Sequence, residues 1–352
     1  MIYKIMDWLK SQFRSENTIN SNGNIWQKIK KHPLRRAFFI FFAAFIFLGM
    51  VFFTKANNFF SVINKNIGKD DLAAIFPIDE KVDLYKNNDR TNFLILGVRG
   101  EGDSEHGGLL TDTIIVASVD SKKKQAALIS LPRDIYLRIP STQKKEKINA
   151  AYLIGEEKLP GGGGLELSKR AVEYVAGLFI DHVISVDFEA FKEIMDEFGG
   201  VDIYLEKEFS ENKQWGTNFY IPAGQQHLDG ETALYYTRSR FSSNDFDRAR
   251  RQQQVLMAIK DKATQLGFLT NPFKINSMLE ILKNRVKTDI TIFDIIKYSR
   301  LMQEIEDNDI KYKVFSTEDG TLIQTYIDGA YVLLPASGNF GEIREISKNI
   351  FN

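Results

Sequence analysis

A continuous apolar segment lies near the start of the chain. Ala37–Thr54, AFFIFFAAFIFLGMVFFT, contains eighteen residues and no charged side chain. At about 1.5 Å per residue, a helix of that length spans about 27 Å, close to the thickness of a bilayer's hydrocarbon core. A buried helix of a soluble domain would normally keep polar positions on one face. The pattern therefore predicts a transmembrane helix over residues 37–54.

The rest of the sequence alternates short apolar runs with segments whose apolar positions recur at helical spacing. The short runs predict buried strands, and they are TNFLILGV (91–98), DTIIVASVD (112–120), QAALISLPRD (125–134), HVISVD (182–187), VDIYLEKEF (201–209) and IKYKVFST (310–317). The helical patterns lie at 165–179, 188–200, 246–263 and 290–305. This alternation predicts an α/β fold, a layered α-β-α domain with helices on both faces of a central mixed sheet.

The domain boundaries follow from where these patterns begin. We expect a stalk over residues 55–90, where the polar clusters KDD and YKNNDR show no clear periodicity. The strand and helix patterns start at residue 91 and continue toward residue 352 without a linker rich in Pro, Gly or Ser. The sequence therefore predicts a single folded domain over residues 91–352.

The charge distribution predicts an orientation in the membrane. The whole chain has 46 Lys and Arg against 46 Asp and Glu, but residues 1–36 alone carry eight basic and two acidic residues. A basic flank stays in the cytoplasm, so we expect residues 1–36 to be a cytoplasmic tail and the domain to be extracytoplasmic. A cleaved signal peptide is the alternative. Its apolar region would run about 7–15 residues and end at a small-residue site, whereas FFTKANNFF follows here.

Composition excludes several classes of chemistry. The chain contains no cysteine, which excludes disulfides, thiolate nucleophiles and cysteine-bound zinc. Its total charge is zero and residues 1–36 contribute +6, so the remainder carries −6. Without a general basic field on the domain, we expect no nucleic-acid partner.

One stretch nevertheless concentrates arginine. YYTRSRFSSNDFDRARRQQQ (235–254) places five arginines within fourteen positions, namely Arg238, Arg240, Arg248, Arg250 and Arg251. A guanidinium is planar, stays charged and fits the oxygens of phosphates and carboxylates. The stretch therefore predicts an anion site, and the alternative is a solvated basic face paired with Asp245 and Asp247.

A helix beginning at Phe246 would separate these arginines. Arg248 would share a face with Arg251 or Gln252, whereas Arg250 would point elsewhere. The forked donors would then lie in the first turns of the helix, where the peptide dipoles already favour an anion.

A second set of charged residues lies at the ends of predicted strands. Asp112 precedes one apolar run and Arg133 and Asp134 follow another, while donors nearby in sequence are Lys147, Asn149 and Tyr152. The mouths of core strands are where α/β sheets bind ligands. A carboxylate beside arginines can orient a guanidinium or hold a divalent cation against phosphate oxygens. Together the two sets predict a site for a polyanion.

The series of motifs resembles the LytR-CpsA-Psr family of bacterial cell-wall glycopolymer ligases. The motifs are TDTIIVASVD, ALISLPRDIYLRIP, KINAAY, IDHVISVDFEAFKEIMDEFGGVDI, IPAGQQHLDGETALYYTRSR and DFDRARRQQ, within residues 91–265. The resemblance implies a phosphotransferase that moves a glycopolymer, such as teichoic acid or capsule, with one phosphate. The donor would be an undecaprenyl-pyrophosphate carrier and the acceptor a peptidoglycan hydroxyl, with assistance from Mg²⁺. A prenyl tail would also need an apolar slot, which the sequence does not place.

The resemblance assigns roles to the charged residues. It implies that the pyrophosphate is bound by Arg133, Arg238, Arg240, Arg248 and Gln252. It implies catalytic roles for Asp112, Arg133 and Arg240, with Asp112 as the Mg²⁺-linked carboxylate. Phosphoryl transfer mainly requires positioning and neutralisation of charge on oxygens, which arginines and a metal ion provide.

The chain departs from the family pattern after the first strand. Arg99 and Gly100 stand where the family usually has an aspartate. Asp103, or its neighbours Glu101 and Glu105, would then supply the second metal carboxylate from a rearranged loop. A site with one acidic ligand and water is the alternative.

Two other functions would use the same residues. A lipid-pyrophosphate hydrolase would bind its substrate with the same arginines but would need no acceptor. A non-catalytic, membrane-anchored protein would hold lipid-linked polymer or regulate its use without transferring it.

Overall fold

The computed structural model describes most of the chain after residue 81. The described residues are 82–100, 108–213, 216, 218–240, 244–267 and 285–352, together with Ile75, Phe76, Lys274 and Met278. The chain divides into two compact units, Met1–Asn57 and Asn58–Asn352, and all described residues belong to the second. The predicted cytoplasmic tail and transmembrane helix, and the loop that carries Asp103, lie outside the described residues. Within the described part, no helix combines the length and hydropathy needed to cross a bilayer.

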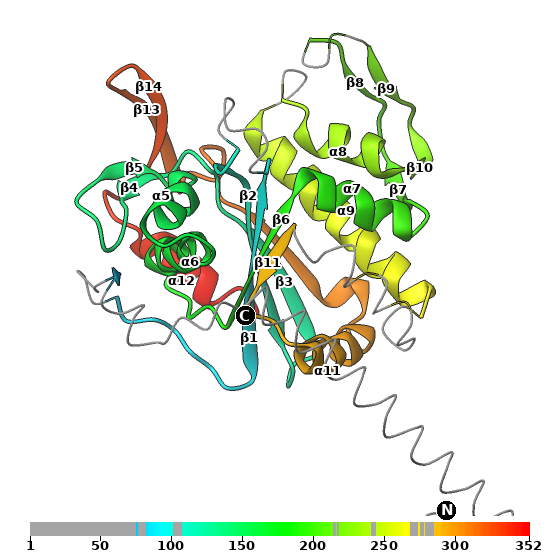
Figure 1. Cartoon of the computed structure of the whole chain (residues 1–352), viewed down its shortest axis with the longest axis horizontal. Coiled ribbons are helices and arrows are strands. Elements are labelled where there is room, and N and C mark those ends of the chain that lie inside the picture. The colour runs from blue at the N-terminus through cyan, green and yellow to red at the C-terminus, as the bar shows by residue number, and fades with distance from the viewer. Residues whose placement is uncertain are drawn as a thin grey trace, which may run out of the picture. The chain divides into compact units, whose positions relative to one another are not determined.

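A mixed six-stranded sheet forms the centre of the second unit (Figure 1). In spatial order its strands are β11 (Val286–Thr288), β6 (His182–Asp187), β1 (Arg90–Val98), β2 (Thr111–Asp120), β3 (Gln125–Ser130) and β12 (Ile310–Val314). The pairs β1–β6 and β3–β12 are parallel and the other three pairs are antiparallel. The predicted mixed sheet is therefore confirmed.

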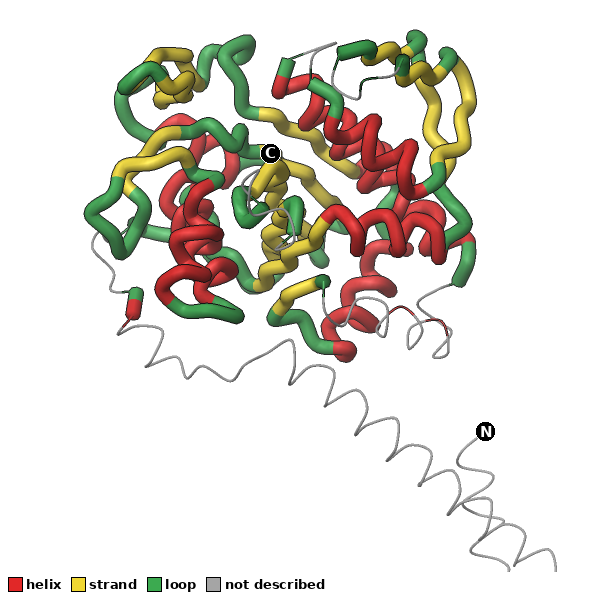
Figure 2. Tube along the Cα trace, turned by 45° about the horizontal axis from the view of Figure 1, so that its top comes forward, coloured by secondary structure: helices red, strands yellow, loops and turns green. Residues whose placement is uncertain are grey.

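Helices cover both faces of this sheet (Figures 1 and 2). One face carries α5 (Ala150–Lys158), α6 (Gly163–Ala176) and α12 (Gly341–Lys348), and the other carries α7 (Phe188–Glu197), α8 (Gly230–Arg238), α9 (Asp245–Gln265) and α11 (Ile292–Gln303). The layered α-β-α arrangement predicted from the alternating patterns is confirmed. The helices predicted at 165–179, 188–200, 246–263 and 290–305 correspond to α6, α7, α9 and α11.

The two faces of the sheet are packed differently. On β1, the alternate residues Leu94, Leu96 and Val98 are buried in one apolar cluster with the inner side of α6. Burying a leucine side chain of this kind contributes roughly 1.5–3 kcal/mol. The Ile95 side chain points to the opposite face, where Ile95 and Gly97 line a cavity beneath α7, α8 and α9. The apolar run 91–98 therefore contributes alternate residues to a packed core on one face of the sheet and to the wall of a cavity on the other.

Four hairpin-like pairs lie outside the main sheet. They are β4 (Tyr136–Arg138) with β5 (Lys145–Lys147), β7 (Val201–Leu205) with β10 (Gly224–Leu228), β8 (Phe209–Glu211) with β9 (Phe219–Ile221), and β13 (Leu322–Ile327) with β14 (Ala330–Pro335). A short 3₁₀ turn, η3 (Asp307–Asp309), precedes β12. The turn between β13 and β14 is Asp328–Gly329, and both residues have positive φ. Asp-Gly is the typical sequence of such a tight hairpin turn.

Part of the segment predicted as a stalk packs on the domain. Phe76 is fully buried in the same cluster as α6. Tyr85 pairs with Leu178 in an isolated bridge, and the Tyr85 amide donates to the Gly177 carbonyl over 2.8 Å. The packed region therefore begins upstream of residue 91, because apolar side chains in this segment complete the core.

Candidate active site

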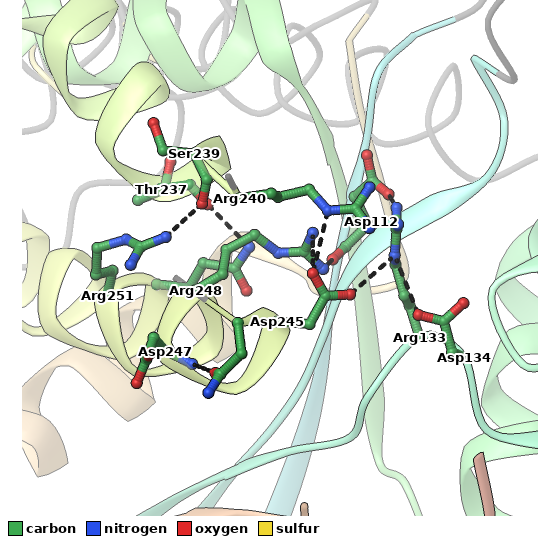
Figure 3. Close-up of polar contacts among 12 residues, drawn as sticks. Asp112, Arg133, Asp134, Thr237, Ser239, Arg240, Asp245, Asp247, Arg248 and Arg251 are labelled. Atoms are coloured by element: carbon green, nitrogen blue, oxygen red, sulfur yellow. Dashed lines mark hydrogen bonds and ion pairs between the residues drawn. The ribbon is translucent and has the colours of Figure 1, made fainter. Parts of the chain in front are cut away.

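Strand topology brings distant charged residues to one edge of the sheet. Strand β2 runs antiparallel to both β1 and β3. The start of β2, which carries Asp112, therefore lies beside the ends of β1 and β3, which lead to Arg99 and Arg133. The end of α8 and the start of α9 reach the same edge and bring Arg240 and Arg248 (Figure 3).

Asp112 is enclosed by three arginines. Arg133 Nη1 donates a hydrogen bond to Asp112 Oδ1, and Arg99 Nε lies 3.6 Å from Oδ2. Arg248 Nη2 donates to the backbone carbonyl of Asp112 over 3.3 Å. Burial alone would raise the pKa of Asp112, but the charges of Arg133 and Arg248 outweigh it and hold that pKa below its ordinary value. Asp112 is therefore ionised at neutral pH.

Asp245, in the first turn of α9, joins the remaining arginines. Its Oδ1 accepts from Arg240 Nε over 3.1 Å and lies 3.2 Å from Arg248 Nη1. Its Oδ2 lies 3.6 Å from Arg133 Nε. Burial alone would raise the pKa of Asp245, but the positive charges of Arg248 and Arg240 lower it by more. The pKa of Asp245 therefore lies below its ordinary value. Asp245 thus holds three guanidinium groups in one place.

These ion pairs form one connected cluster with excess positive charge. Its cations are Arg99, Arg133, Lys147, Arg240 and Arg248, and its carboxylates are Asp112, Asp134 and Asp245. The cluster therefore has two more positive than negative charges. The buried Nε atoms of Arg133 and Arg248 have no hydrogen-bond acceptor among the described residues. Buried donors of this kind are costly unless a ligand satisfies them, so the cluster suits an anion.

The alternative of a solvated basic face describes Arg250, and in part Arg240, which is exposed and pairs with Asp245 while it also lines the cavity. Arg250 is exposed and pairs with Asp247 over 2.5 Å and with Glu318 over 2.9 Å. Arg248 and Arg251, by contrast, are only 5% and 7% exposed. The helical spacing correctly predicted that Arg250 would point away from its neighbours.

An apolar cavity of about 580 Å³ opens beneath this cluster. Its walls come from β1, β2, β6 and β11 on one side and from α7, α8, α9 and α11 on the other, with Ile95, Ile184, Phe191, Leu234 and Leu256 among the lining residues. Its polar lining residues include Arg99, Asp112, Arg238, Arg240, Arg248 and Gln252. The cavity therefore combines an apolar interior with a strongly cationic mouth.

The structure brings the predicted phosphate-binding residues together. Arg238 ends α8 and lies over the Phe188 ring at 4.0 Å, and Gln252 Nε2 donates to the Thr237 carbonyl over 3.3 Å. Arg240 follows Arg238 after one extended residue. Arg133 does not line the apolar cavity but reaches its mouth through the hydrogen bond to Asp112.

The three other predicted donors have different positions. Lys147 Nζ donates to Asp134 Oδ1 over 2.6 Å and so belongs to the cluster. Asn149 is buried, and its backbone amide donates to the Arg133 carbonyl over 3.3 Å, which fixes the loop after β3. Tyr152 lies in the hydrophobic core and lines none of the cavities described here. It is buried on α5 together with Ala151 and Ile154.

Two residues near the mouth have roles that the sequence did not predict: Arg251, which was grouped with the anion-binding arginines, and Asp187, which was not singled out. Arg251 holds the end of α8, with Nε donating to the Tyr236 carbonyl over 2.9 Å and Nη2 to the Ser239 carbonyl. Asp187, at the end of β6, lines the cavity and caps α7 through the Ala190 amide. Burial raises the pKa of Asp187 above its ordinary value. Its position directly after the run HVISVD, at the mouth of a core strand, was the available signal.

The described carboxylates do not form a complete metal cage. No group of three or more His, Asp or Glu side chains within the described ranges is placed to hold a metal ion. Mg²⁺, however, is usually bound through one or two carboxylates together with substrate phosphates. Asp112, ionised and at the mouth of the cavity, fits that smaller requirement.

The fold and the site define a class of protein. A layered α/β domain that places an arginine cluster over an apolar cavity can bind an amphiphile with an anionic head group. The model of the LytR_cpsA_psr family matches residues 50–349, and the chain belongs to this family.

Individual relatives agree with this assignment. The chain is 32% identical over 247 residues to the polyisoprenyl-teichoic acid–peptidoglycan teichoic acid transferase TagU of Bacillus cereus, covering 68% of this chain and 75% of that protein. It is 30% identical over 271 residues to the Bacillus licheniformis protein of the same name, covering 76% and 80%. The crystal structure of Bacillus subtilis TagV is similar with a TM-score of 0.58 and 27% identity, covering 76% of this chain and 98% of that one.

Proposed function

We propose that this protein is a membrane-anchored phosphotransferase of cell-wall assembly. It moves a glycopolymer with one phosphate from an undecaprenyl-pyrophosphate carrier to a hydroxyl of peptidoglycan, on the outer side of the membrane. The observation that carries the proposal is the arginine cluster directly at the mouth of the 580 Å³ apolar cavity. The names of the relatives, which are teichoic acid transferases, support the same conclusion.

The two parts of the site match the two parts of such a donor. The prenyl chain would lie in the apolar cavity, where each buried methylene contributes about 0.8 kcal/mol. The pyrophosphate would accept hydrogen bonds from Arg133, Arg238, Arg240, Arg248 and Gln252. The excess positive charge and the unsatisfied Nε atoms of Arg133 and Arg248 support this placement.

The proposed reaction is a single displacement at phosphorus. The peptidoglycan hydroxyl oxygen bonds to the phosphorus next to the polymer, and the bond from that phosphorus to the bridging oxygen breaks. The products are a phosphodiester between polymer and peptidoglycan, and prenyl monophosphate. The hydroxyl proton ends on the monophosphate. Arg133, Arg240 and Arg248 would stabilise the charge that grows on the phosphate oxygens, and preorganised donors of this kind commonly supply about 3 kcal/mol each.

Magnesium has a defined place in this proposal. Asp112 would hold the ion together with oxygens of the pyrophosphate, and the ion would neutralise charge on them. The predicted second ligand, Asp103, lies outside the described residues. The arginine side chains of the protein would bind and orient the pyrophosphate.

Transfer can be tested against both alternatives in one assay. The full-length protein in detergent is given a prenyl-pyrophosphate-linked glycopolymer and Mg²⁺, with or without peptidoglycan oligomers. A transferase forms the phosphodiester product only with the acceptor, and a hydrolase releases phosphorylated polymer without it. A binding protein retains the lipid and yields neither product, so either of the last two results would overturn the proposal.

Variants locate the reaction within the molecule. Asp112→Ala and Arg133→Ala should each lower the transfer rate about 100-fold. Asp112→Ala removes the proposed carboxylate ligand of Mg²⁺, and Arg133→Ala removes a positive donor from the reacting phosphates. Arg138→Ala is the matched control, since Arg138 is exposed on β4 and lines neither the cavity nor the cluster. Transfer at the wild-type rate by both site variants would show that the reaction occurs elsewhere.

A further inference from the structure

A second, polar groove lies on the other side of the arginine cluster. It has a volume of about 590 Å³ and is bounded by the loop after β3, the start of α9, residues 317–318 and the β13–β14 hairpin. Arg240 lines both the groove and the apolar cavity. Arg133 lines the groove and is hydrogen-bonded to Asp112, which lines the cavity. The cluster therefore stands between the two spaces.

The charged groups of this groove are largely neutralised in pairs. Asp134 accepts from Lys147, and Glu318 accepts from Asn244 over 3.2 Å and from Arg250. The groove is also lined by Arg133, Arg240 and Asp245 of the cluster, so its three cations and its three carboxylates balance and no charge dominates. Such a mixed lining suits a neutral, hydroxyl-rich ligand more than an anion or a lipid.

The β13–β14 hairpin adds an aromatic surface to the groove. It stands away from the central sheet in Figure 1, and Gln324, Tyr331 and Leu333 from it line the groove. In the antiparallel register Tyr326 lies opposite Tyr331 and Gln324 opposite Leu333, so all four share one face. Tyr326 is 71% exposed, and its ring lies 6.0 Å from that of Tyr331 in an edge-to-face arrangement.

This aromatic face has the character of a binding surface. Exposed aromatic side chains beside satisfied polar groups are typical of recognition sites, because they bury large areas at low entropic cost. A saccharide presents apolar C–H faces to rings and hydroxyl groups to carboxylates and amides. The groove and the hairpin together provide both kinds of partner.

The geometry of phosphoryl transfer decides which saccharide lies there. The attacking and leaving oxygens lie roughly in line, on opposite sides of the phosphorus. With the departing prenyl phosphate in the apolar cavity, the attacking hydroxyl must approach from the far side of the cluster, where the groove opens. We infer that the groove and hairpin bind the glycan strand of the peptidoglycan acceptor, an inference that rests on the proposed transferase function.

Steady-state kinetics of the full-length protein test this placement. Tyr326→Ala and Tyr331→Ala should raise KM for short peptidoglycan glycan oligomers about five- to tenfold each, through loss of aromatic contact. KM for the lipid-linked donor should stay unchanged. Tyr220→Ala is the control, because Tyr220 is a 55% exposed tyrosine on β9, in another hairpin. A rise in donor KM alone would assign the groove to the donor's polymer and overturn the inference, as would no change in either KM.

Direct binding separates this inference from the proposed function. The same glycan oligomers are titrated onto wild-type protein and the tyrosine variants without a donor, and binding is followed by NMR or calorimetry. Weaker binding by Tyr326→Ala and Tyr331→Ala, but not by Tyr220→Ala, supports the acceptor site even if transfer itself fails. Equal binding by all variants overturns it even if transfer succeeds.

Discussion

Arg248 carries a charge that the folded protein compensates only in part. It is buried in the first turns of α9, with Asp245 as its ion-pair partner. Burial and repulsion from Arg133 lower the pKa of Arg248 from its ordinary value to about 10. A fall of that size corresponds to roughly 3 kcal/mol of stability lost in keeping the group charged at neutral pH. A bound diphosphate would recover part of that loss.

Replacing Arg248 should therefore separate stability from ligand binding. We expect Arg248→Gln to unfold at a melting temperature no lower than that of the wild type when no ligand is present. The added stability that a prenyl diphosphate gives the wild type, about 2.7 kcal/mol at a hundred times Kd, should largely disappear. Thermal unfolding at pH 7 with and without geranylgeranyl diphosphate measures both.

The pH dependence of stability has a defined sign at this residue. Because the folded pKa of Arg248, about 10, lies below its ordinary value, the folded state binds fewer protons than the unfolded state in the pH window between the two values. The destabilising effect is thus fully present at neutral pH and fades as pH rises through that window. A variant that melts several degrees lower yet keeps the full ligand shift would contradict this account of Arg248.

At the scale of elements, the site depends on how α9 holds the end of α8. The last carbonyl groups of a helix have no partner within it. Here Arg251 donates to the Tyr236 and Ser239 carbonyls, and Gln252 donates to that of Thr237. The Arg251 guanidinium also lies over the Phe209 ring at 4.9 Å. These contacts fix the direction in which Arg238 and Arg240 leave α8.

Arg251→Lys should weaken donor binding even though Arg251 does not line the cavity in which the donor would lie. A lysine ammonium cannot reach both carbonyls with the planar fork of a guanidinium. We expect a loss of about 1–3 kcal/mol in the free energy of unfolding, since a buried carbonyl is left unsatisfied. Donor affinity should fall with it, because Arg238 and Arg240 lose their fixed positions. Arg250→Lys is the control on the same helix, and equal effects of the two changes on donor affinity would contradict a positioning role for Arg251.

The sequence predicted elements better than the contacts between them. Apolar periodicity placed β1, β2, β6, α6 and α9 correctly, because each pattern reflects one element's own buried face. It also placed Arg248 and Gln252 on one face. The periodicity did not distinguish the roles of Arg251 and Arg248. Arg251 binds backbone carbonyls at the end of α8, whereas Arg248 lines the cavity, and this difference depends on where α8 packs against α9. The Asp328–Gly329 pair was a usable signal for β13–β14, whereas the groove beside it depends on contacts between distant segments.

At the scale of the whole described unit, the sheet separates a closely packed core on one face from a large cavity on the other. The face under α5, α6 and α12 is packed with fully buried residues. On the other face the helices stand off the sheet and leave the 580 Å³ cavity. A second apolar cavity of about 290 Å³ lies further toward α11 and shares Ile95, Ile184, Ile290 and Ile295 with the first. The two cavities therefore adjoin, and we expect them to form one apolar path for a prenyl chain that leads away from the arginine cluster.

This path predicts how affinity should depend on the length of the prenyl chain. Ile184 lines both cavities, so Ile184→Trp should obstruct the passage between them and leave the arginine cluster intact. A prenyl diphosphate of about ten carbons, confined to the first cavity, should bind the variant within about threefold of the wild type. Longer chains should lose the gain in affinity that each further buried methylene, about 0.8 kcal/mol, provides in the wild type.

Affinities across a series of chain lengths test this directly, because the head group stays constant. Ile184→Val, which removes one methylene and blocks nothing, is the control and should follow the wild-type series. A parallel loss at every length would mean that the tryptophan disturbs the head-group site, and an unchanged slope would place the prenyl chain outside this path. For Ile184→Trp we expect the binding free energy to level off only for chains longer than the first cavity holds. That result would support a lipid chain bound along the cavities on this face of the sheet, with its phosphates at the arginine cluster.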